Sequence, residues 1–421
     1  AVQITFERIL RTSLHEICLD RILELIKEKY WDDKKENPFS CLPARVVEHL
    51  VEVCGTSKRF WKFSYFRLLL SSGKLQELRL CFPVFFTDTC KLLPQMLTEE
   101  GCRNIKILEL DKHFQNGESG WLERLIEKLP FLESLVIRTF FNPTALKNCK
   151  RLKRVEVIYR MILKGINYFP IEAVDTLSCL EDLEEFDVFR FNKSKSHFQH
   201  VVKLLENHPK LISLGCTDSS RAAHHIHQNS RGSKPPQYGL RKCSWEYNRF
   251  SFRERTSMHL ERIRSAMLLF LLVEELEILV LHEDCFEHLK NLRHLRSLKI
   301  ELDVALPHPK FFSFLSYIGK QLRHLYILSC YEVPVNVISK HSSNLEYLKV
   351  GGHVTVCDSV KSSYSFNKLR RVEINAIDAN SLLYIVQHSK NLKEVYFYQA
   401  VALDDQQLLE ILKRIPMLFI V

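Results

Sequence analysis

A six-residue pattern, L-x-x-L-x-L with other apolar residues at some leucine positions, recurs along most of this chain. Between the copies, segments such as 119–130, 197–209 and 380–391 carry apolar residues at i, i+3, i+4 and i+7, which is the period of a helix packed on one face. The thirteen copies begin at Leu75, Ile105, Leu132, Leu152, Leu183, Leu211, Leu240, Leu276, Leu295, Leu322, Leu345, Leu369 and Leu392.

From Leu75 to Leu392 there are twelve steps over 317 residues, which is about 26 residues per repeat. A strand and a helix repeated at this period predict leucine-rich repeats, which stack into a curved solenoid with the strands on the concave face. We therefore expect an α/β fold that resembles the ribonuclease-inhibitor-like horseshoe. Extracellular repeats hold Asn at one fixed position after the strand. Here that position is mostly occupied by other residues, as at Pro83 and His113, so the array resembles intracellular repeats.

The domain plan that follows has a helical region at 1–70 and a repeat array at 71–421. The array contains a basic stretch at about 219–264, with ten Lys and Arg against three Glu, and we expect an exposed, mobile insertion there. It is either a solvated loop or a basic patch for nucleic acid or an acidic partner. The last residues predict the start of another strand, so we expect the protein to continue beyond Val421.

Composition excludes several classes of function. No apolar run reaches the roughly 18 residues that a membrane span needs, and the first residues lack the pattern of a signal peptide. Thirteen scattered cysteines without a Cys-x-x-Cys, several of them (Cys18, Cys216) at apolar positions, are typical of a reducing compartment, so we expect a cytoplasmic or nuclear protein. The run His224, His225 and His227 lacks nearby cysteine or carboxylate partners, and we assign it no metal.

No phosphate-binding loop, nucleophile elbow or zinc-protease motif is present in the sequence, and glycine accounts for only 12 of 421 residues. The closely spaced Cys and His ligands of a RING domain are missing as well. We therefore expect neither an enzyme nor a cofactor, and interpret the chain as a protein that recruits other proteins.

Near the start of the chain, Leu14, Cys18 and Ile22 are spaced i, i+4, i+8 and form one helical stripe. Such a stripe caps the first repeat or docks on a partner. With Ser13 it matches S-L-x-x-x-C-x-x-x-I, the core of the VHL box. The later segment 42–50 has Leu42, Pro43, Val46 and Leu50 in the order of a cullin-2 box, and proline suits the first turn of a helix.

The two boxes ahead of a leucine-rich array resemble the cullin-2 substrate receptors of the zygote-defective eleven and Zer type and PRAME-like proteins. This resemblance implies a ubiquitin-ligase receptor that binds elongin C, with elongin B, through Ser13, Leu14, Cys18 and Ile22. It implies cullin 2 as the partner of Leu42, Pro43, Val46 and Leu50, and a protein as substrate. The 421 residues do not include the armadillo repeats with which the first two receptor types read N-terminal degrons, so that substrate class is not carried over.

Three other interpretations use the same residues. The segment 42–64 also resembles an F-box, which would lead to Skp1 and cullin 1, although the interval between Pro43 and Trp61 is short. A repeat scaffold without a ligase partner is the second. Nucleic-acid binding is the third, and we do not favour it, because aromatic residues are only weakly interleaved with the basic stretch at 245–255.

The residue between the last two leucines of each copy points away from the core, onto the concave face. In the later repeats this position holds tyrosines beside lysines, and tyrosine is a common anchor of protein interfaces. We therefore predict a substrate site at Tyr326, Lys349, Tyr396 and Tyr398; exposed strand tyrosines that reflect β-propensity alone are the alternative. The full line is Arg79, Glu109, Val136, Glu156, Asp187, Gly215, Ser244, Val280, Lys299, Tyr326, Lys349, Glu373 and Tyr396.

Overall fold

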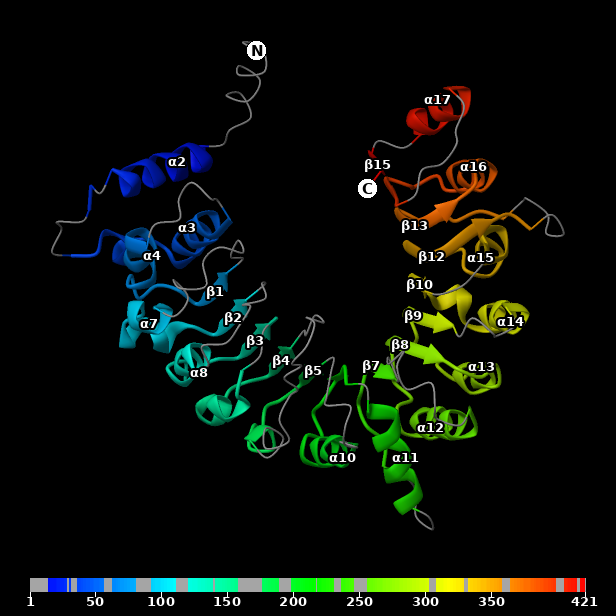
Figure 1. Ribbon diagram of the computed structural model, residues 1–421, viewed down its shortest axis with the longest axis horizontal. Helices are drawn as coiled ribbons and strands as arrows, with labels where there is room; N and C mark the ends of the chain where they lie inside the picture. Colours follow the sequence, from blue (N-terminus) through cyan, green and yellow to red (C-terminus); the bar gives the residue numbers. More distant parts are fainter. Residues whose placement is uncertain are drawn as a thin grey trace. The chain divides into compact units, whose positions relative to one another are not determined.

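Two compact units, Ala1–Lys195 and Ser196–Val421, make up the chain. Each has short parallel strands side by side, with helices on one face of the strands (Figure 1). Each unit is therefore an α/β leucine-rich-repeat solenoid, as the sequence predicts. The computed structural model describes residues 14–28, 30–31, 36–56, 63–80, 92–110, 120–138, 141–157, 176–188, 198–216, 218–230, 236–245, 256–302, 308–328, 332–357, 364–398, 405–414 and 417–420.

The strands of the first unit pair in parallel with equivalent residues side by side. Leu78 pairs with Leu108, which pairs with Leu135, and all three are fully buried. These are the second leucines of their copies, so the repeat pattern itself sets the register. The strands are β1 (Glu77–Leu80), β2 (Ile107–Leu110), β3 (Ser134–Ile137), β4 (Arg154–Val157) and β5 (Glu185–Val188).

The helical segments of the first unit lie before β1 and between the strands. They are α2 (Leu14–Lys27), η1 (Pro38–Cys41), α3 (Ala44–Thr56), α4 (Phe63–Leu70), α6 (Leu93–Met96), α7 (Glu99–Asn104), α8 (Trp121–Glu127) and η2 (Pro143–Asn148). Thr98 caps α7 by accepting a hydrogen bond from the Gly101 N–H at 3.0 Å.

The second unit continues the same plan with longer strands. Its strands are β6 (Ser213–Leu214), β7 (Lys242–Trp245), β8 (Glu275–Val280), β9 (Ser297–Leu302), β10 (His324–Leu328), β11 (Glu332–Pro334), β12 (Tyr347–Thr355), β13 (Arg371–Ile377), β14 (Glu394–Phe397) and β15 (Met417–Ile420). Its helices are α10 (Phe198–Asn207), α11 (Ser219–Asn229), α12 (Thr256–Leu269), α13 (Cys285–Leu289), α14 (His308–Ile318), η3 (Gly319–Gln321), α15 (Val335–His341), α16 (Ala379–Gln387) and α17 (Asp405–Arg414).

One strand register differs from the expectation. Leu276 on β8 pairs with Leu298 on β9, so Leu276 is the second leucine of its copy and Val273 is the first. The residue that takes the outward position is Glu277, whereas Val280 is fully buried. The expectation for Val280 was wrong because apolar residues follow one another along β8, and the pattern fits two registers there.

The described residues of the basic stretch at 219–264 do not form the insertion that its composition suggested. Most of its described residues belong to α11, β7 and α12, which are parts of ordinary repeats. Helix α11 buries Ala222, Ala223 and Ile226. The sequence pattern did not predict this helix, because its buried face consists of small residues with few large apolar ones. Segments 231–235, with the Arg-Gly-Ser-Lys-Pro run, and 246–255 lie outside the described residues.

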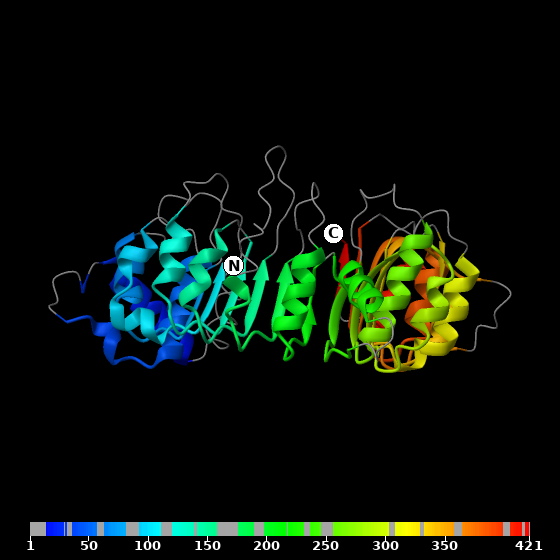
Figure 2. The same ribbon diagram turned by 90° about the horizontal axis from the view of Figure 1, so that it is seen from below.

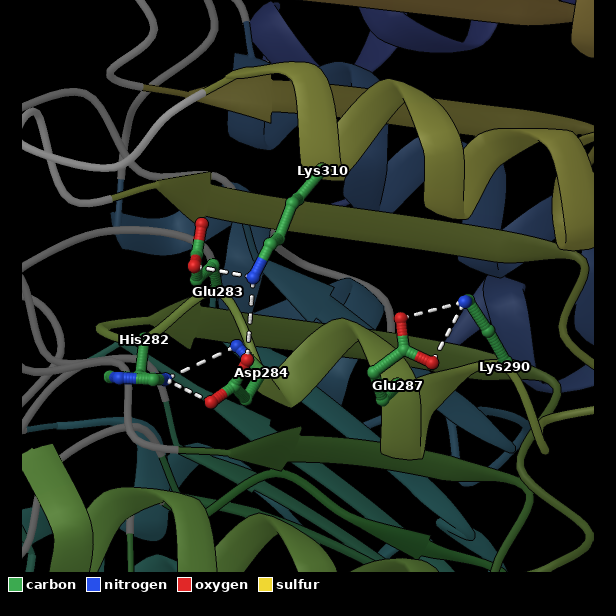
Figure 3. A network of polar contacts seen from close by, with 6 residues as sticks. All are labelled: His282, Glu283, Asp284, Glu287, Lys290 and Lys310. Carbon is green, nitrogen blue, oxygen red and sulfur yellow. Dashed lines mark hydrogen bonds and ion pairs between the residues drawn. The ribbon is translucent and has the colours of Figure 1, made fainter.

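Aromatic packing and ion pairs link the helices of neighbouring repeats. Phe286 on α13 stacks against Phe314 on α14 with ring centroids 5.3 Å apart. At the surface, Lys310 of α14 reaches back to Glu283 and Asp284 just before α13, while Lys290 bonds Glu287 at 2.7 Å (Figure 3). Such exposed pairs contribute little individually, so we attribute the stability of the helical layer to the buried rings.

Cysteines in the described part of the chain have free thiols. Burial raises the pKa of Cys54 and of Cys149 to about 12, so both stay protonated and pack as small apolar residues. Cys216 is also buried, as its pattern predicted, but Cys18 is exposed. The environment of Cys18 therefore differs from that of the core cysteines.

A close approach between two repeats requires glycine at position 319. A Cβ added to Gly319 would lie 2.6 Å from the carbonyl oxygen of His341 and 2.5 Å from Ser342 Oγ. We predict that Gly319→Ala lowers the free energy of unfolding by about 1–3 kcal/mol, as overpacking in a core does. Urea unfolding followed by circular dichroism measures this change.

The matched control is Gly239→Ala, because nothing lies within 4 Å of a Cβ at Gly239. We expect that variant to unfold within about 0.5 kcal/mol of the wild type. Equal stability of the two variants would show that the two repeats are not in close contact at Gly319.

Candidate functional site

Helix α2 has one buried face and one exposed apolar face. Leu23 and Ile26 are buried, whereas Cys18 is exposed, Ile22 is half-buried and Ile17 is 53% exposed. Of the predicted docking residues, Ser13 and the side chain of Leu14 lie outside the described residues. The stripe that we expected either to cap the array or to dock is thus accessible at Cys18.

The structure assigns the capping of the first strand to α3. The Glu48 carboxylate accepts hydrogen bonds from the Gln76 and Glu77 N–H groups at 2.9 and 3.0 Å. These two amides belong to the open side of the first strand, which has β2 on its other side. The segment before α3 is tied down as well, because Asn37 donates to the Leu68 carbonyl at 2.7 Å.

The residues predicted to contact a cullin lie at the start of α3 and do not share one environment. Pro43 is exposed and directly precedes the helix, with its carbonyl accepting from the Val47 N–H at 3.3 Å. Leu42 and Val46 are half-buried. Leu50 is fully buried and packs in the core, so it is not available to a partner.

In the second unit, strand pairing places the predicted substrate residues in one row. Tyr326 on β10 pairs with Lys349 on β12, then come Glu373 on β13 and Tyr396 on β14. Tyr398 follows Tyr396 by two residues and is 45% exposed. The helices of this unit lie on one side of its strands (Figure 2). The residue that precedes each row member is buried, namely Leu325, Leu348, Val372 and Val395, so the row itself belongs to the other face.

Glu373 is the electrostatic centre of this row, and only 5% of its side chain is exposed. Lys349 Nζ lies 2.6 Å from its carboxylate, and the Arg371 guanidinium bonds its other oxygen. Burial alone would raise the Glu373 pKa, but hydrogen bonds from Lys349, Tyr347 and Arg371 outweigh it and lower that pKa to about 2. The carboxylate therefore stays ionised and holds two cations in place.

Aromatic rings surround these charges. Tyr326 and Tyr347 meet edge to face with centroids 5.0 Å apart, and Arg371 lies over the rings of Tyr347 and Tyr396 at 5.3 and 4.7 Å. We call Tyr326, Tyr347, Lys349, Arg371, Glu373 and Tyr396 the tyrosine–arginine cluster. Tyr347 and Arg371 were missed in the sequence, although both precede an identified row residue by two positions and so share its face.

The first unit has a cavity of about 280 Å³ on its strands. Arg79, Arg138 and Arg154 line it together with Glu109 and Glu156. Glu77 lies 2.9 Å from Arg79, and Glu156 lies 2.6 Å from Arg154. Since the carboxylates already neutralise these two arginines, the cavity lacks the excess charge of an anion site.

The histidines of α11 are held by neighbouring polar groups. His224 lies 3.1 Å from Ser265 Oγ and 2.8 Å from the Gln228 amide, and His225 contacts Asn229 at 3.0 Å. In the part of the chain that the structure describes, no cluster of three or more His, Cys, Asp or Glu could hold a metal ion. No described helix is long and apolar enough to cross a membrane.

Comparisons with known proteins concern the fold. No family model matches the chain, and no curated protein matches it. Among solved structures, Rad7 in the yeast Rad7–Elc1 complex is 13% identical, with 93% of this chain and 95% of that chain covered and a TM-score of 0.49. An internalin from Listeria monocytogenes is 15% identical, with coverage of 76% and 81% and a TM-score of 0.39. A leucine-rich-repeat protein of Leptospira interrogans is 13% identical, with coverage of 85% and 91% and a TM-score of 0.35.

The low pKa of Glu373 predicts a pH dependence of stability. Its folded-state pKa is below the unfolded value, so the stabilisation is fully present above about pH 4.5 and is lost as the pH falls toward 2. We predict that Glu373→Gln lowers the free energy of unfolding by about 3 kcal/mol at pH 7. The difference in the free energy of unfolding between wild type and variant should become smaller between pH 4.5 and 3, as measured by urea unfolding at each pH.

Glu287→Gln is the control, since Glu287 forms an exposed pair with Lys290. Its effect should be about 0–1 kcal/mol. A gap between wild type and Glu373→Gln that stays constant from pH 7 to pH 3 would contradict the electrostatic role of Glu373.

Proposed function

We propose that this chain is the substrate receptor of a cullin–RING ubiquitin ligase and docks on elongin C through α2. The observation that carries the proposal is the exposed apolar face of α2. Burying an apolar side chain contributes about 1.5–3 kcal/mol, and α2 leaves Ile17 and Cys18 in solvent. The opposing interpretation, in which this stripe caps the array, is weakened because Glu48 of α3 bonds the first strand.

The geometry of α2 suits docking of one helix face. At about 100° per residue, Cys18 lies about 80° around the helix from the buried Ile26 and about 140° from the buried Leu23, whereas Ile22 lies only about 40° from Ile26. Leu25 is half-buried and extends the same stripe toward the end of the helix. Helix α2 is therefore anchored by its buried face and leaves an adjoining apolar stripe partly accessible at Cys18 and Leu25, as a helix that docks into a groove requires.

Cullin binding is proposed for the start of α3. Leu42, Pro43 and Val46 are at least partly accessible there, and they follow the elongin-docking helix in the order found in cullin-2 receptors. Leu50 has a structural role in this proposal. Ubiquitin transfer itself would occur on a separate RING protein and its E2, and this chain would position the target.

The substrate site is proposed on the tyrosine–arginine cluster together with Tyr398. Tyrosine and arginine are the residue types that dominate protein interfaces, because they offer large contact area and several hydrogen bonds. Here Arg371 is held between two rings and by Glu373. The arrangement is thus ordered before a partner binds, which lowers the entropic cost of association.

The docking proposal predicts the effect of removing two stripe residues. Leu14→Ala combined with Cys18→Ala should remove roughly 3–5 kcal/mol of binding free energy, so elongin C capture should fall more than 100-fold. Titration of purified elongin B–elongin C against the full chain, by biolayer interferometry, measures this. The melting temperature of the array should not change, because Cys18 is exposed.

Asp20→Ala with Glu24→Ala is the matched control, because both residues are exposed on another side of α2. It should bind like the wild type. Capture of elongin C at wild-type strength by the stripe variant would refute the docking proposal. Loss of both folding and elongin C capture would favour the interpretation in which the stripe caps the array. Recovery of Skp1 and cullin 1 without elongin C would favour the F-box alternative.

The substrate site makes a separate prediction. Tyr326→Ala, Tyr396→Ala and Tyr398→Ala together should remove partners that proximity labelling detects with the wild-type chain. The control carries alanine at Tyr30, Tyr317 and Tyr364, which are exposed and lie outside the cluster. An identical set of labelled proteins for the wild type and both variants would place the substrate site elsewhere, whether or not elongin C binds.

A further inference from the structure

In the second unit, the residues just before the strands form a continuous row across the sheet, along the edge at which the strands begin. The backbone N–H of each bonds the carbonyl of its predecessor in the preceding repeat, at 2.7 to 2.9 Å. Neighbouring strands are about 4.8 Å apart, so the row spans roughly 19 Å. The ladder begins at Ile212, Arg241 and Glu274, and we call its last five members the inner row: Arg296, Arg323, Glu346, Arg370 and Lys393.

A second row lies three residues earlier in each repeat and adds more positive charge. It contains Arg293, Lys320, Ser343, Asn367 and Lys390, and Lys368 follows Asn367. All cations of both rows are exposed. We call the following set the basic edge: Arg293, Arg296, Lys320, Arg323, Lys368, Arg370, Lys390 and Lys393.

Internal ion pairs neutralise little of this charge. Arg296 lies 3.8 Å from Glu274, and Arg323 lies 3.8 Å from Glu346, with both arginines more than half exposed. The other six cations form no ion pair with the residues that the structure describes. Like charges on neighbouring strands are unfavourable for folding, so stability alone does not account for the basic edge.

Side-chain amides hold the basic edge in a fixed shape. Gln321 donates to the Leu292 carbonyl at 2.7 Å, Asn344 to that of Lys320 at 2.8 Å, and Asn391 to that of Asn367 at 2.6 Å. Each bond joins a repeat to the one before it. The backbone that carries the cations is therefore arranged before any ligand binds.

In the corresponding inner row of the first unit, acidic side chains neutralise the basic ones. The same backbone ladder there runs through Gln76, Lys106, Glu133, Lys153 and Glu184, and the four charged residues among them alternate in sign. Lys106 lies 3.6 Å from Glu133. The excess positive charge of the inner row is thus a property of the second unit and not of the repeat architecture.

We propose that the basic edge binds an acidic polypeptide segment in an extended conformation. An extended chain rises about 3.3 Å per residue, so about six residues cover the inner row. Single-stranded nucleic acid is less favoured, because neither row contains an aromatic side chain on which bases could stack. The proposal depends on neither elongin docking nor the tyrosine–arginine cluster.

Fluorescence anisotropy with the full chain tests the basic edge. The probe is a fluorescein-labelled twelve-residue peptide of alternating Glu and Ser, compared with its Gln-for-Glu analogue and with a twelve-nucleotide single-stranded DNA and a duplex. We expect the acidic peptide to bind more tightly than the other three probes. Its affinity should fall several-fold between 50 and 200 mM salt, as for exposed charges.

The variant Arg293→Gln, Lys320→Gln, Arg370→Gln, Lys393→Gln should bind the acidic peptide at least tenfold more weakly. The matched control removes four exposed charges from the first unit, by Arg103→Gln, Lys147→Gln, Lys150→Gln and Lys153→Gln, and should stay within twofold of the wild type. Equal weakening by both variants, or no weakening, overturns the proposal. Stronger binding of either DNA than of the peptide overturns it in favour of a nucleic-acid surface.

Discussion

Parallel pairing of each strand with its counterpart in the next repeat is the constraint on which the rest of this structure depends. Leu78, Leu108 and Leu135 lie side by side because each is the same position of its copy. A slip of one residue would turn such leucines to solvent and bring outward residues into the core. Residues about 26 apart in the sequence therefore become neighbours about 4.8 Å apart, and the surface is organised in rows.

The rows explain why much of the fold and part of the candidate site could be predicted from the sequence. The repeat pattern predicts the strands, and the position between its last two leucines predicts the neighbours Tyr326, Lys349, Glu373 and Tyr396. Prediction failed where the pattern was ambiguous. Continuous apolar residues along β8 allowed two registers, and only pairing of Leu276 with Leu298 decides between them.

Other features required the three-dimensional neighbours of each residue. The sequence has apolar residues on more than one side of α2, and nothing in their spacing says that Leu23 and Ile26 face the core while Cys18 does not. From the sequence alone, Glu373 would be interpreted as an ordinary exposed glutamate on a strand. Its burial among Lys349, Arg371 and Tyr347 depends on β12 and β13 pairing in register.

The bond between Glu48 and the first strand has a consequence for self-association. The outer strand of a parallel array exposes unpaired N–H groups, and such an edge is a template for pairing with another chain. Glu48 occupies the N–H groups of Gln76 and Glu77 with a single carboxylate oxygen. The carboxylate also brings a negative charge to an edge that an incoming strand would have to desolvate. By occupying these two N–H groups, one side chain of α3 makes the start of this edge a poorer template for pairing with another chain.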